Sequence, residues 1–191
     1  EFESLGGTVV DQIQYNSGDQ DFSSAITKIK GMDFDVIYVS GYYNEAGKII
    51  KQAKDAGIDT PILGTDGFDS ETLIDQAGKD YCNNVYFTTA YTAIDPSEQL
   101  SKFIEEYKAE YNENPGMFAA LAFDATNLLL DELQASGKSG AELNEAIKKV
   151  NYTGVTGAFT FDESNHTPIK PVLVVELVNG EQSNVTPVDV K

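Results

Sequence analysis

The chain has no arginine and no tryptophan, and only one cysteine and one histidine among its 191 residues. Because all 13 basic residues are lysines, a bidentate guanidinium clamp on a carboxylate or phosphate is excluded. A single cysteine, Cys82, cannot form an internal disulfide bond, and it leaves the redox compartment undecided. His166 lies among the turn residues "DESNHTP". Metal clusters and catalytic triads need several convergent groups, so a single histidine in a turn indicates neither kind of site.

Positive charge and long apolar runs are also scarce. The formal net charge is −18, which argues against nucleic acid and anionic lipid surfaces as partners because both repel a strongly negative protein. No apolar run approaches the ~20 residues of a membrane helix. The apolar fraction of 41% is ordinary for a globular protein, so one or two domains with a real core are expected.

Short β-branched runs alternate with amphipathic stretches in the first half of the chain. This alternation predicts βαβ units on a parallel sheet, and therefore an α/β fold. The run at 35–40 is almost continuously apolar, which predicts a strand buried on both faces. The predicted strands are 7–15, 35–40, 60–64 and 84–91, and the predicted helices are 22–30, after an Asp21 cap, and 44–57.

Helical patterns dominate from Asp95 to Val150. Asp95-Pro96 predicts a cap followed by a first-turn proline, and "SGAE" from Ser139 predicts a capping box. A middle helix is predicted at 116–136, with an apolar stripe. Its stripe residues are Phe118, Leu121, Ala122, Ala125, Leu128 and Leu129. The end of the chain is again β, at 155–161 and 171–185, with a type I′ turn at Asn179-Gly180.

The chain opens on "EFESLGG", which is typical of a helix tail and its glycine cap. This opening predicts that residues are missing upstream. The apolar faces of the three later helices would then pack on the parallel sheet of the first half or on a sheet that missing residues supply.

The stretch "VSGYYNEAGKII" at 39–50 raises the possibility of a phosphate-binding loop. A P-loop has four residues between its glycines, followed by Lys and then Ser or Thr. Here five residues separate Gly41 from Gly47, and Ile49 stands where the hydroxyl should be. Lys48 also falls inside the predicted helix. No nucleotide, metal or other cofactor is therefore predicted.

Two strand ends carry the candidate binding residues. Ligands of open α/β sheets bind at the carboxyl ends of strands, where Tyr42 follows the strand at 35–40 and Asp66 follows the strand at 60–64. A carboxylate in a cleft can bind an ammonium group, and aromatic rings can pack over that cation. Alternatively, Tyr42 is a packing residue and Asp66 a turn former or helix cap. Composition and position leave both interpretations open.

The segment "DFSSAITKIKGMDFDVIYVSGYYNEAGKIIKQAKDAGIDTPILGTDGF" resembles the second lobe of type I periplasmic binding proteins of the branched-chain amino acid class. "FAALAFDATNLLLDEL" and "VTGAFTFDESNHTPIKPVLVVELVNG" are similar to that family's later helices and closing strands. The resemblance extends over essentially the whole chain, in order. It implies two Rossmann-like α/β lobes joined by three crossings, with a ligand trapped between them.

By this resemblance, residues 1–90 and 168–191 form most of lobe two. Residues 91–167 form the C-terminal, largely helical part of lobe one with the hinge crossings, and the N-terminal part of lobe one is missing. The family's ligand tyrosine matches Tyr42, and its acidic residue, often Glu, matches the shorter Asp66. Tyr43 and Phe68 are candidates for the site wall by adjacency. The missing part of lobe one would hold the ligand carboxylate, which fits the lack of arginine.

The implied function is that of the solute-binding component of an ABC importer, which passes an amino acid or similar small molecule to a transporter permease. It implies an extracytoplasmic location, in the periplasm or as a cell-surface lipoprotein. One alternative is a ligand-sensing receptor ectodomain with the same fold. Another is an enzyme with Asp66 and Tyr42 as acid and base, although no nucleophile elbow, metal-ligand cluster or usable histidine supports it. Without its N-terminal part, the chain is expected to self-associate or to stay bound to that part.

Overall fold

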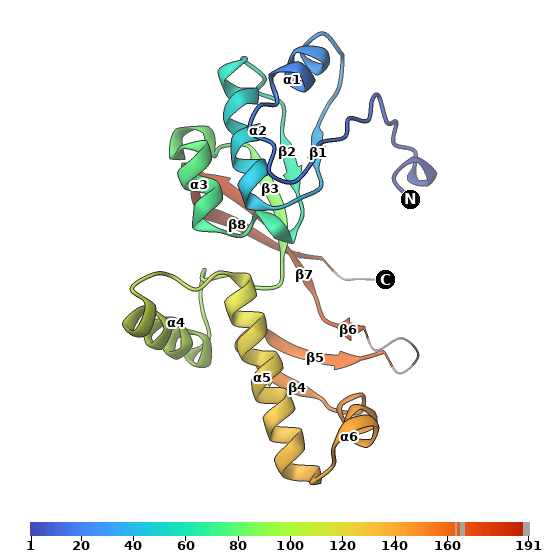
Figure 1. The fold of residues 1–191 in the computed structure, drawn as a ribbon, viewed down its shortest axis with the longest axis vertical. Helices are drawn as coiled ribbons and strands as arrows, with labels where there is room; N and C mark the ends of the chain where they lie inside the picture. The colour runs from blue at the N-terminus through green and yellow to red at the C-terminus, as the bar shows by residue number, and fades with distance from the viewer. Residues whose placement is uncertain (163, 165–166, 189–191) are drawn as a thin grey trace. The chain divides into compact units, whose positions relative to one another are not determined.

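The computed structural model describes residues 1–162, 164 and 167–188, which form two compact units (Figure 1). Unit 1 comprises Glu1–Thr88 and Val175–Asn184, and unit 2 comprises Thr89–Val174 and the segment from Val185 onward. His166 lies outside the described residues. The boundaries predicted from the sequence were at 90/91 and 167/168. That the units correspond to two lobes of a binding protein stays a prediction.

Unit 1 contains most of a five-stranded sheet in the order β1-β2-β3-β7-β8. The first three strands are parallel, with Val39 paired to Gly64 and Gly64 paired to Phe87, which confirms the predicted α/β class. Asn179 and Gly180 connect β7 to β8 and have φ of 53° and 76°, as a type I′ turn requires. The strands are β1 (Ile37–Val39), β2 (Ile62–Gly64), β3 (Val85–Thr89), β7 (Val172–Val178) and β8 (Glu181–Val188).

The helices α1 and α2 lie where the sequence predicts them, whereas α3, between β2 and β3, was not predicted. α2 packs against α3 (Figure 1). Gly47 lies inside α2, where an added Cβ would stand 2.8 Å from the Leu73 carbonyl oxygen of α3. This glycine therefore serves close helix packing. The Asp21 carboxylate accepts a hydrogen bond from the Ser23 amide at 2.9 Å, but the N-cap residue of α1 is Phe22, so the predicted Asp21 cap is wrong. The elements are η1 (Glu3–Leu5), α1 (Ser23–Lys30), α2 (Tyr43–Asp55), η2 (Asp66–Phe68), α3 (Glu71–Ala77) and η3 (Lys79–Tyr81).

One predicted strand of unit 1 does not form, and the predicted burial of another is wrong. Residues 7–15 belong to no helix or strand, and Val9 and Val10 are 51% and 53% exposed. Their β-branched side chains favour extended backbone, but a strand also needs the backbone groups of a neighbour to pair with. β1 forms as predicted but is not buried on both faces, because Tyr38 is 64% exposed while Val39 is 6% exposed. The described residues thus cover only one face of this strand.

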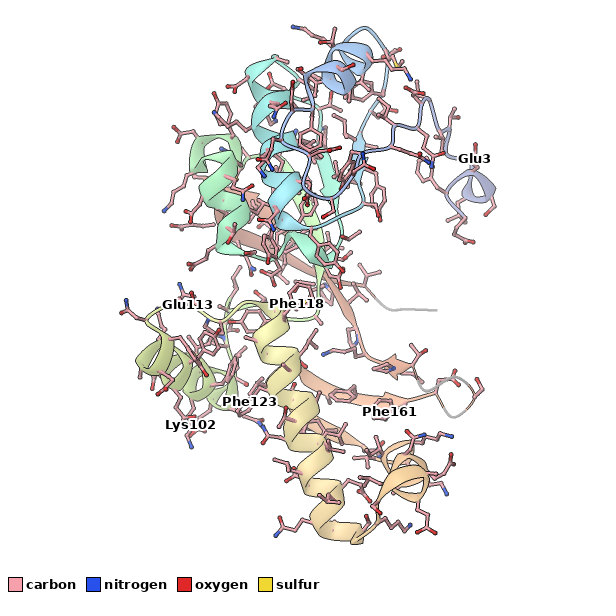
Figure 2. All side chains as sticks on the ribbon, in the orientation of Figure 1. Glu3, Lys102, Glu113, Phe118, Phe123 and Phe161 are labelled. Atoms are coloured by element: carbon pink, nitrogen blue, oxygen red, sulfur yellow. The ribbon has the colours of Figure 1, made fainter. Side chains whose placement is uncertain are left out.

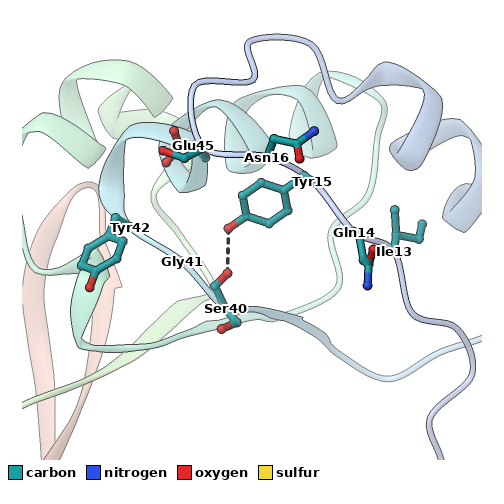
Figure 3. A pocket seen from close by; sticks show the side chains of 9 residues that line it. Ile13, Gln14, Tyr15, Asn16, Ser40, Gly41, Tyr42 and Glu45 are labelled. Atoms are coloured by element: carbon teal, nitrogen blue, oxygen red, sulfur yellow. Dashed lines mark hydrogen bonds between the residues drawn. The ribbon is translucent and has the colours of Figure 1, made fainter.

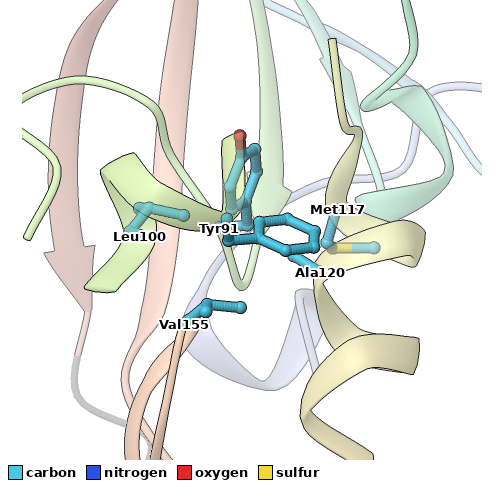
Figure 4. Close-up of a cluster of buried hydrophobic side chains, with 6 residues drawn as sticks. Tyr91, Leu100, Met117, Ala120 and Val155 are labelled. Carbon is cyan, nitrogen blue, oxygen red and sulfur yellow. The ribbon is translucent and has the colours of Figure 1, made fainter. Parts of the chain in front are cut away.

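Unit 2 combines three helices with a three-stranded antiparallel sheet in the order β4-β5-β6. A cluster of buried side chains from α4, α5 and the segments around them forms its core (Figure 4). The cluster consists of Tyr91, Leu100, Phe103, Met117, Ala120 and Val155. The elements are α4 (Glu98–Tyr111), α5 (Met117–Ser136), α6 (Gly140–Ile147), β4 (Tyr152–Gly154), β5 (Gly157–Phe161) and β6 (Pro168–Ile169).

The three helices of unit 2 lie where the sequence predicts them, but two caps differ. The Ser97 hydroxyl accepts a hydrogen bond from the Leu100 amide at 3.2 Å and caps α4. The predicted Asp95 cap is therefore wrong, since Asp95 lies outside the helix with φ of 51°. Ser139 precedes α6 but forms no side-chain cap hydrogen bond. Gly140 has a left-handed φ of 56°, and this backbone geometry prevents the predicted capping box.

One face of α5 carries exposed apolar side chains, of which Phe118 and Phe123 are visible in Figure 2. Phe118, Phe123, Leu129, Leu130 and Leu133 are between 40% and 53% exposed. Phe118 and Leu129 belong to the apolar stripe predicted for this helix. Self-association of the chain, or its binding to an N-terminal part, stays a prediction.

The buried thiol of Cys82 leads to a test of stability against pH. Cys82 is 0% exposed, and burial raises the pKa of its thiol from 9.0 to about 11. In the unfolded chain the thiol loses its proton near pH 9, whereas in the folded chain it keeps it. The free energy of unfolding should therefore fall by up to about 2 kcal/mol as the pH rises from 9 to 11.

Urea denaturation of the wild type and of Cys82→Ala at several pH values checks this expectation. The tyrosines contribute equally to both proteins. The difference between the two plots of unfolding free energy against pH therefore gives the contribution of the Cys82 thiol. Parallel slopes would contradict the expectation, as would rapid labelling of Cys82 by a thiol reagent in the folded protein.

Candidate ligand-binding site

The carboxyl ends of β1 and β2 lie side by side in unit 1, because Val39 pairs with Gly64. Tyr42 comes three residues after Val39 and is the N-cap residue of α2, with extended backbone (φ −113°, ψ 167°). Asp66 comes after β2 and opens the turn η2. The parallel pairing therefore brings both predicted site residues to the same edge of the sheet, which is where α/β sheets bind ligands.

Both residues are accessible at this edge. Tyr42 is 61% exposed although its ring is large and largely apolar. Asp66 is exposed, and its carboxylate has no hydrogen bond or ion pair with any described residue. Its backbone carbonyl accepts a hydrogen bond from the Asp69 amide at 3.2 Å, so Asp66 does begin a turn. That turn uses the main chain alone, and the carboxylate remains available for another partner.

The Gly41 carbonyl oxygen joins the two strand-end loops. The Thr65 hydroxyl donates a hydrogen bond to it at 3.1 Å. A Cβ added to Gly67 would collide with the same oxygen and would stand 3.0 Å from Cδ1 of the Tyr42 ring. The glycine after Asp66 thus allows the Asp66 turn and the Tyr42 ring to approach each other closely.

The two weaker candidates differ in accessibility. Tyr43 is the first residue of α2 and is half-buried. Phe68 is 1% exposed, its ring centroid lies 6.5 Å from that of Phe87, and a Cβ on Gly64 would collide with its ring. In unit 1 Phe68 is a core residue beneath the strand ends. Ligand contacts by Tyr43 and Phe68 stay predictions, and for Phe68 such a contact requires the ring to become accessible.

A pocket of about 400 Å³ opens beside the end of β1. Residues 13–17 line one side, and Ser40, Gly41, Tyr42 and Glu45 line the other (Figure 3). Burial raises the pKa of the Tyr15 hydroxyl, and the negative charge of Glu45 raises it further. The sequence analysis did not single out Tyr15, because its contact with Ser40, 25 residues away, depends on how distant segments pack.

Nothing in the described residues indicates a metal centre or a membrane segment. No group of three or more His, Cys, Asp or Glu side chains in this part of the chain could hold a metal ion. Over the same residues, every helix is too short or too polar to cross a bilayer.

Comparison with known proteins identifies similar chains that bind amino acids. The chain is 28% identical over 149 residues to the leucine-, isoleucine-, valine-, threonine- and alanine-binding protein of Pseudomonas aeruginosa, covering 78% of this chain and 39% of that protein. The branched-chain amino acid transporter substrate binding protein LivJ of Streptococcus pneumoniae, solved with isoleucine, is 40% identical with a TM-score of 0.87. The leucine binding protein LivK of Thermotoga maritima is 35% identical with a TM-score of 0.83. These relatives are named as binding proteins, not as enzymes.

The two solved structures match nearly all of this chain, but this chain matches only about half of each of them. The LivJ structure covers 97% of this chain and the LivK structure 96%, whereas this chain covers 53% of each of them. The chain thus spans about half the length of these relatives. The family model described as periplasmic binding protein matches residues 1–182, and the resemblance inferred from the sequence is confirmed. Because this match extends over most of the chain and the α/β architecture agrees with both solved structures, the chain belongs to the periplasmic binding protein family.

Proposed function

We propose that this chain is part of an extracytoplasmic solute-binding protein that binds an amino acid and delivers it to the permease of an ABC importer. In this proposal Asp66 pairs with the ligand ammonium, and the ring of Tyr42 packs on the ligand. The protein binds its ligand without changing it chemically, so the bound amino acid should be recovered intact after hours of incubation.

The observation that carries the proposal is the unpaired, exposed carboxylate of Asp66 beside an exposed tyrosine ring. A carboxylate forms charge-assisted hydrogen bonds to an ammonium group, and an aromatic face attracts the same cation. The names of the relatives support an amino acid as the ligand, since they bind leucine, isoleucine, valine, threonine and alanine.

The ligand carboxylate needs a different partner. The chain has no arginine, and the strand ends of β1 and β2 present a carboxylate, which would repel a second one. We therefore assign the recognition of the ligand carboxylate to residues outside this chain, in agreement with its covering about half of the related structures.

A thermal-shift screen of the full-length protein against the twenty amino acids tests the proposal. A ligand that binds only the folded state stabilises it by about 2.7 kcal/mol at one hundred times its Kd, which raises the melting temperature. We expect the largest shifts with branched-chain amino acids. The matched control is 4-methylpentanoic acid, which is leucine without its amino group and should give no shift. Equal shifts with both compounds would refute ammonium recognition.

Truncation of the two neighbouring tyrosines tests which ring meets the ligand. Tyr42→Ala should weaken isoleucine binding about tenfold, because an exposed ring that packs on a ligand loses its contact area. Tyr43→Ala should have a smaller effect, since Tyr43 is half-buried in the first turn of α2. Isothermal titration calorimetry of both variants measures the order, and the reverse order would place Tyr43 at the ligand.

A further inference from the structure

Tyr15 contacts the strand end that carries Tyr42. Its hydroxyl donates a hydrogen bond to the Ser40 carbonyl oxygen at 2.7 Å, across 25 residues of sequence (Figure 3). Its ring meets Phe22 edge to face, with centroids 5.7 Å apart and an interplanar angle of 85°. Phe22 is 5% exposed. The Tyr15 ring is thus anchored on the core of unit 1, while its hydroxyl reaches the end of β1.

The contact at Gly41 is close enough to exclude a side chain there. A Cβ added to Gly41 would collide with the Tyr15 hydroxyl oxygen and would stand 3.2 Å from ring carbon Cζ. The φ of Gly41 is not positive, so alanine would fit its backbone. The hydroxyl of Tyr15, and not the backbone conformation, therefore requires glycine at this position.

A second hydrogen bond holds the chain on the other side of Tyr42. The Glu45 carboxylate, in the first turn of α2, accepts a hydrogen bond from the Gly18 amide at 2.7 Å. Glu45 is only 7% exposed. The segment from Tyr15 to Gly18 therefore holds the chain on both sides of Tyr42, at Ser40 and at Glu45.

The same strand end connects to the Asp66 turn. The Gly41 carbonyl oxygen accepts a hydrogen bond from the Thr65 hydroxyl at 3.1 Å and lies against Gly67. Hydrogen bonds and close backbone contacts thus link Tyr15, through Ser40 and Gly41, to the loop that carries Asp66. Geometry at a binding site depends on such supporting contacts, because a small displacement of the ligand-contacting groups costs affinity.

We propose that Tyr15 is a positioning residue of the ligand site, which fixes the Ser40–Gly41 backbone and so the direction of the Tyr42 ring. This inference rests on the proposed function, since it assigns Tyr15 a role in that same site. Tyr15 itself need not touch the ligand. Its hydroxyl acts on the ligand-free protein, and this permits a test that does not require binding.

The first arm of the test uses no ligand. 3-Fluorotyrosine placed at position 42 of the full-length protein reports the surroundings of that ring by 19F NMR. Tyr15→Phe should shift or broaden this resonance. The matched control is Tyr81→Phe, which removes another tyrosyl hydroxyl of unit 1, bonded to Asp55 of α2, and should leave the resonance unchanged. An unchanged resonance in Tyr15→Phe would overturn the proposal.

The second arm measures isoleucine binding by calorimetry. Tyr15→Phe should raise the Kd about 3- to 10-fold, as expected for one hydrogen bond, and Tyr81→Phe should change it less than about twofold. In a Tyr42→Ala background Tyr15→Phe should raise the Kd by clearly less than it does in the wild type, because a positioning residue acts mainly through the ring it positions. Additive losses would overturn the proposal.

A suppressor experiment separates positioning from general destabilisation. Gly41→Ala should lose most of the affinity, because the new methyl group collides with the Tyr15 hydroxyl. Adding Tyr15→Phe should restore part of the affinity, since the hydroxyl oxygen is then gone and the nearest ring carbon stands 3.2 Å from the added Cβ. A double variant weaker than Gly41→Ala alone would contradict the proposal. If the wild-type protein binds no amino acid, the proposed function fails, and the ligand-free 19F comparison still decides the role of Tyr15.

Discussion

Replacing Asp124 with alanine is expected to lower the free energy of unfolding of unit 2 by about 3–5 kcal/mol, the range for removing one partner of a buried charged network. Asp124 is 2% exposed in the middle of α5. Its two carboxylate oxygens accept hydrogen bonds from the Val155 amide at 2.7 Å and from the Thr156 amide and hydroxyl at 2.8 and 2.6 Å. Alanine would leave the buried Val155 amide and the half-buried Thr156 amide and hydroxyl without this acceptor.

The surroundings of Asp124 explain why water cannot easily replace its carboxylate. A Cβ on Gly154 would collide with both carboxylate oxygens, so the turn from β4 to β5 lies directly against them. Lys170 donates to the carbonyl and hydroxyl oxygens of Thr156 at 2.9 and 2.8 Å. Burial lowers the pKa of Lys170, and the charge of Asp124 opposes that shift. Loss of Asp124 therefore also removes a charge that stabilises the half-buried Lys170 ammonium.

Hydrogen exchange of peptides from α5 and from the β4–β5 region measures this loss within unit 2 itself. Asp131→Ala is the matched control, because Asp131 lies on the same helix and is exposed; its effect should stay within about 0.5 kcal/mol. Asp124→Asn should be intermediate, since the amide keeps one acceptor oxygen but points donors at other donors. A wild-type exchange pattern in Asp124→Ala would show that the network adds no stability.

Replacing Asp66 with asparagine in the full-length protein should weaken amino acid binding by about 1.5–3 kcal/mol, the range for a hydrogen bond to a charged group. This corresponds to a Kd raised about 10- to 150-fold. Asparagine has nearly the same shape and can still begin the η2 turn, which uses the Asp66 backbone carbonyl. The melting temperature without ligand should therefore stay close to that of the wild type, and the loss should appear in binding alone.

Calorimetry with isoleucine measures the change, and Asp75→Asn provides the matched control. Asp75 is an exposed residue of α3 in the same unit and does not lie at the strand ends. Asp75→Asn therefore removes the same charge at a distance from the proposed site. If Asp66→Asn and Asp75→Asn weaken binding equally, the loss of affinity comes from the long-range effect of net charge, which added salt would reduce. Wild-type affinity in Asp66→Asn would return Asp66 to the role of a turn residue.

Local patterns in the sequence determined the order and type of most elements. The β1, β2 and β3 strands and the α2, α4 and α5 helices lie where apolar periodicity and glycine or proline signals predict them. The same patterns placed Tyr42 and Asp66 after two consecutive parallel strands. Since parallel strands end at the same edge of a sheet, their juxtaposition followed without any knowledge of side-chain contacts.

Contacts between distant segments were decided only in the tertiary structure. Residues 7–15 have the composition of a strand and form none, because pairing depends on a neighbour that composition does not specify. Tyr15 reaches Ser40 across 25 residues, and Asp124 reaches Val155 across 31. Neither pair leaves a periodic or motif-like signal, since each depends on how whole elements pack. The sequence by itself therefore determined the α/β order and the two candidate ligand residues, whereas packing decided which side chains hold them in place.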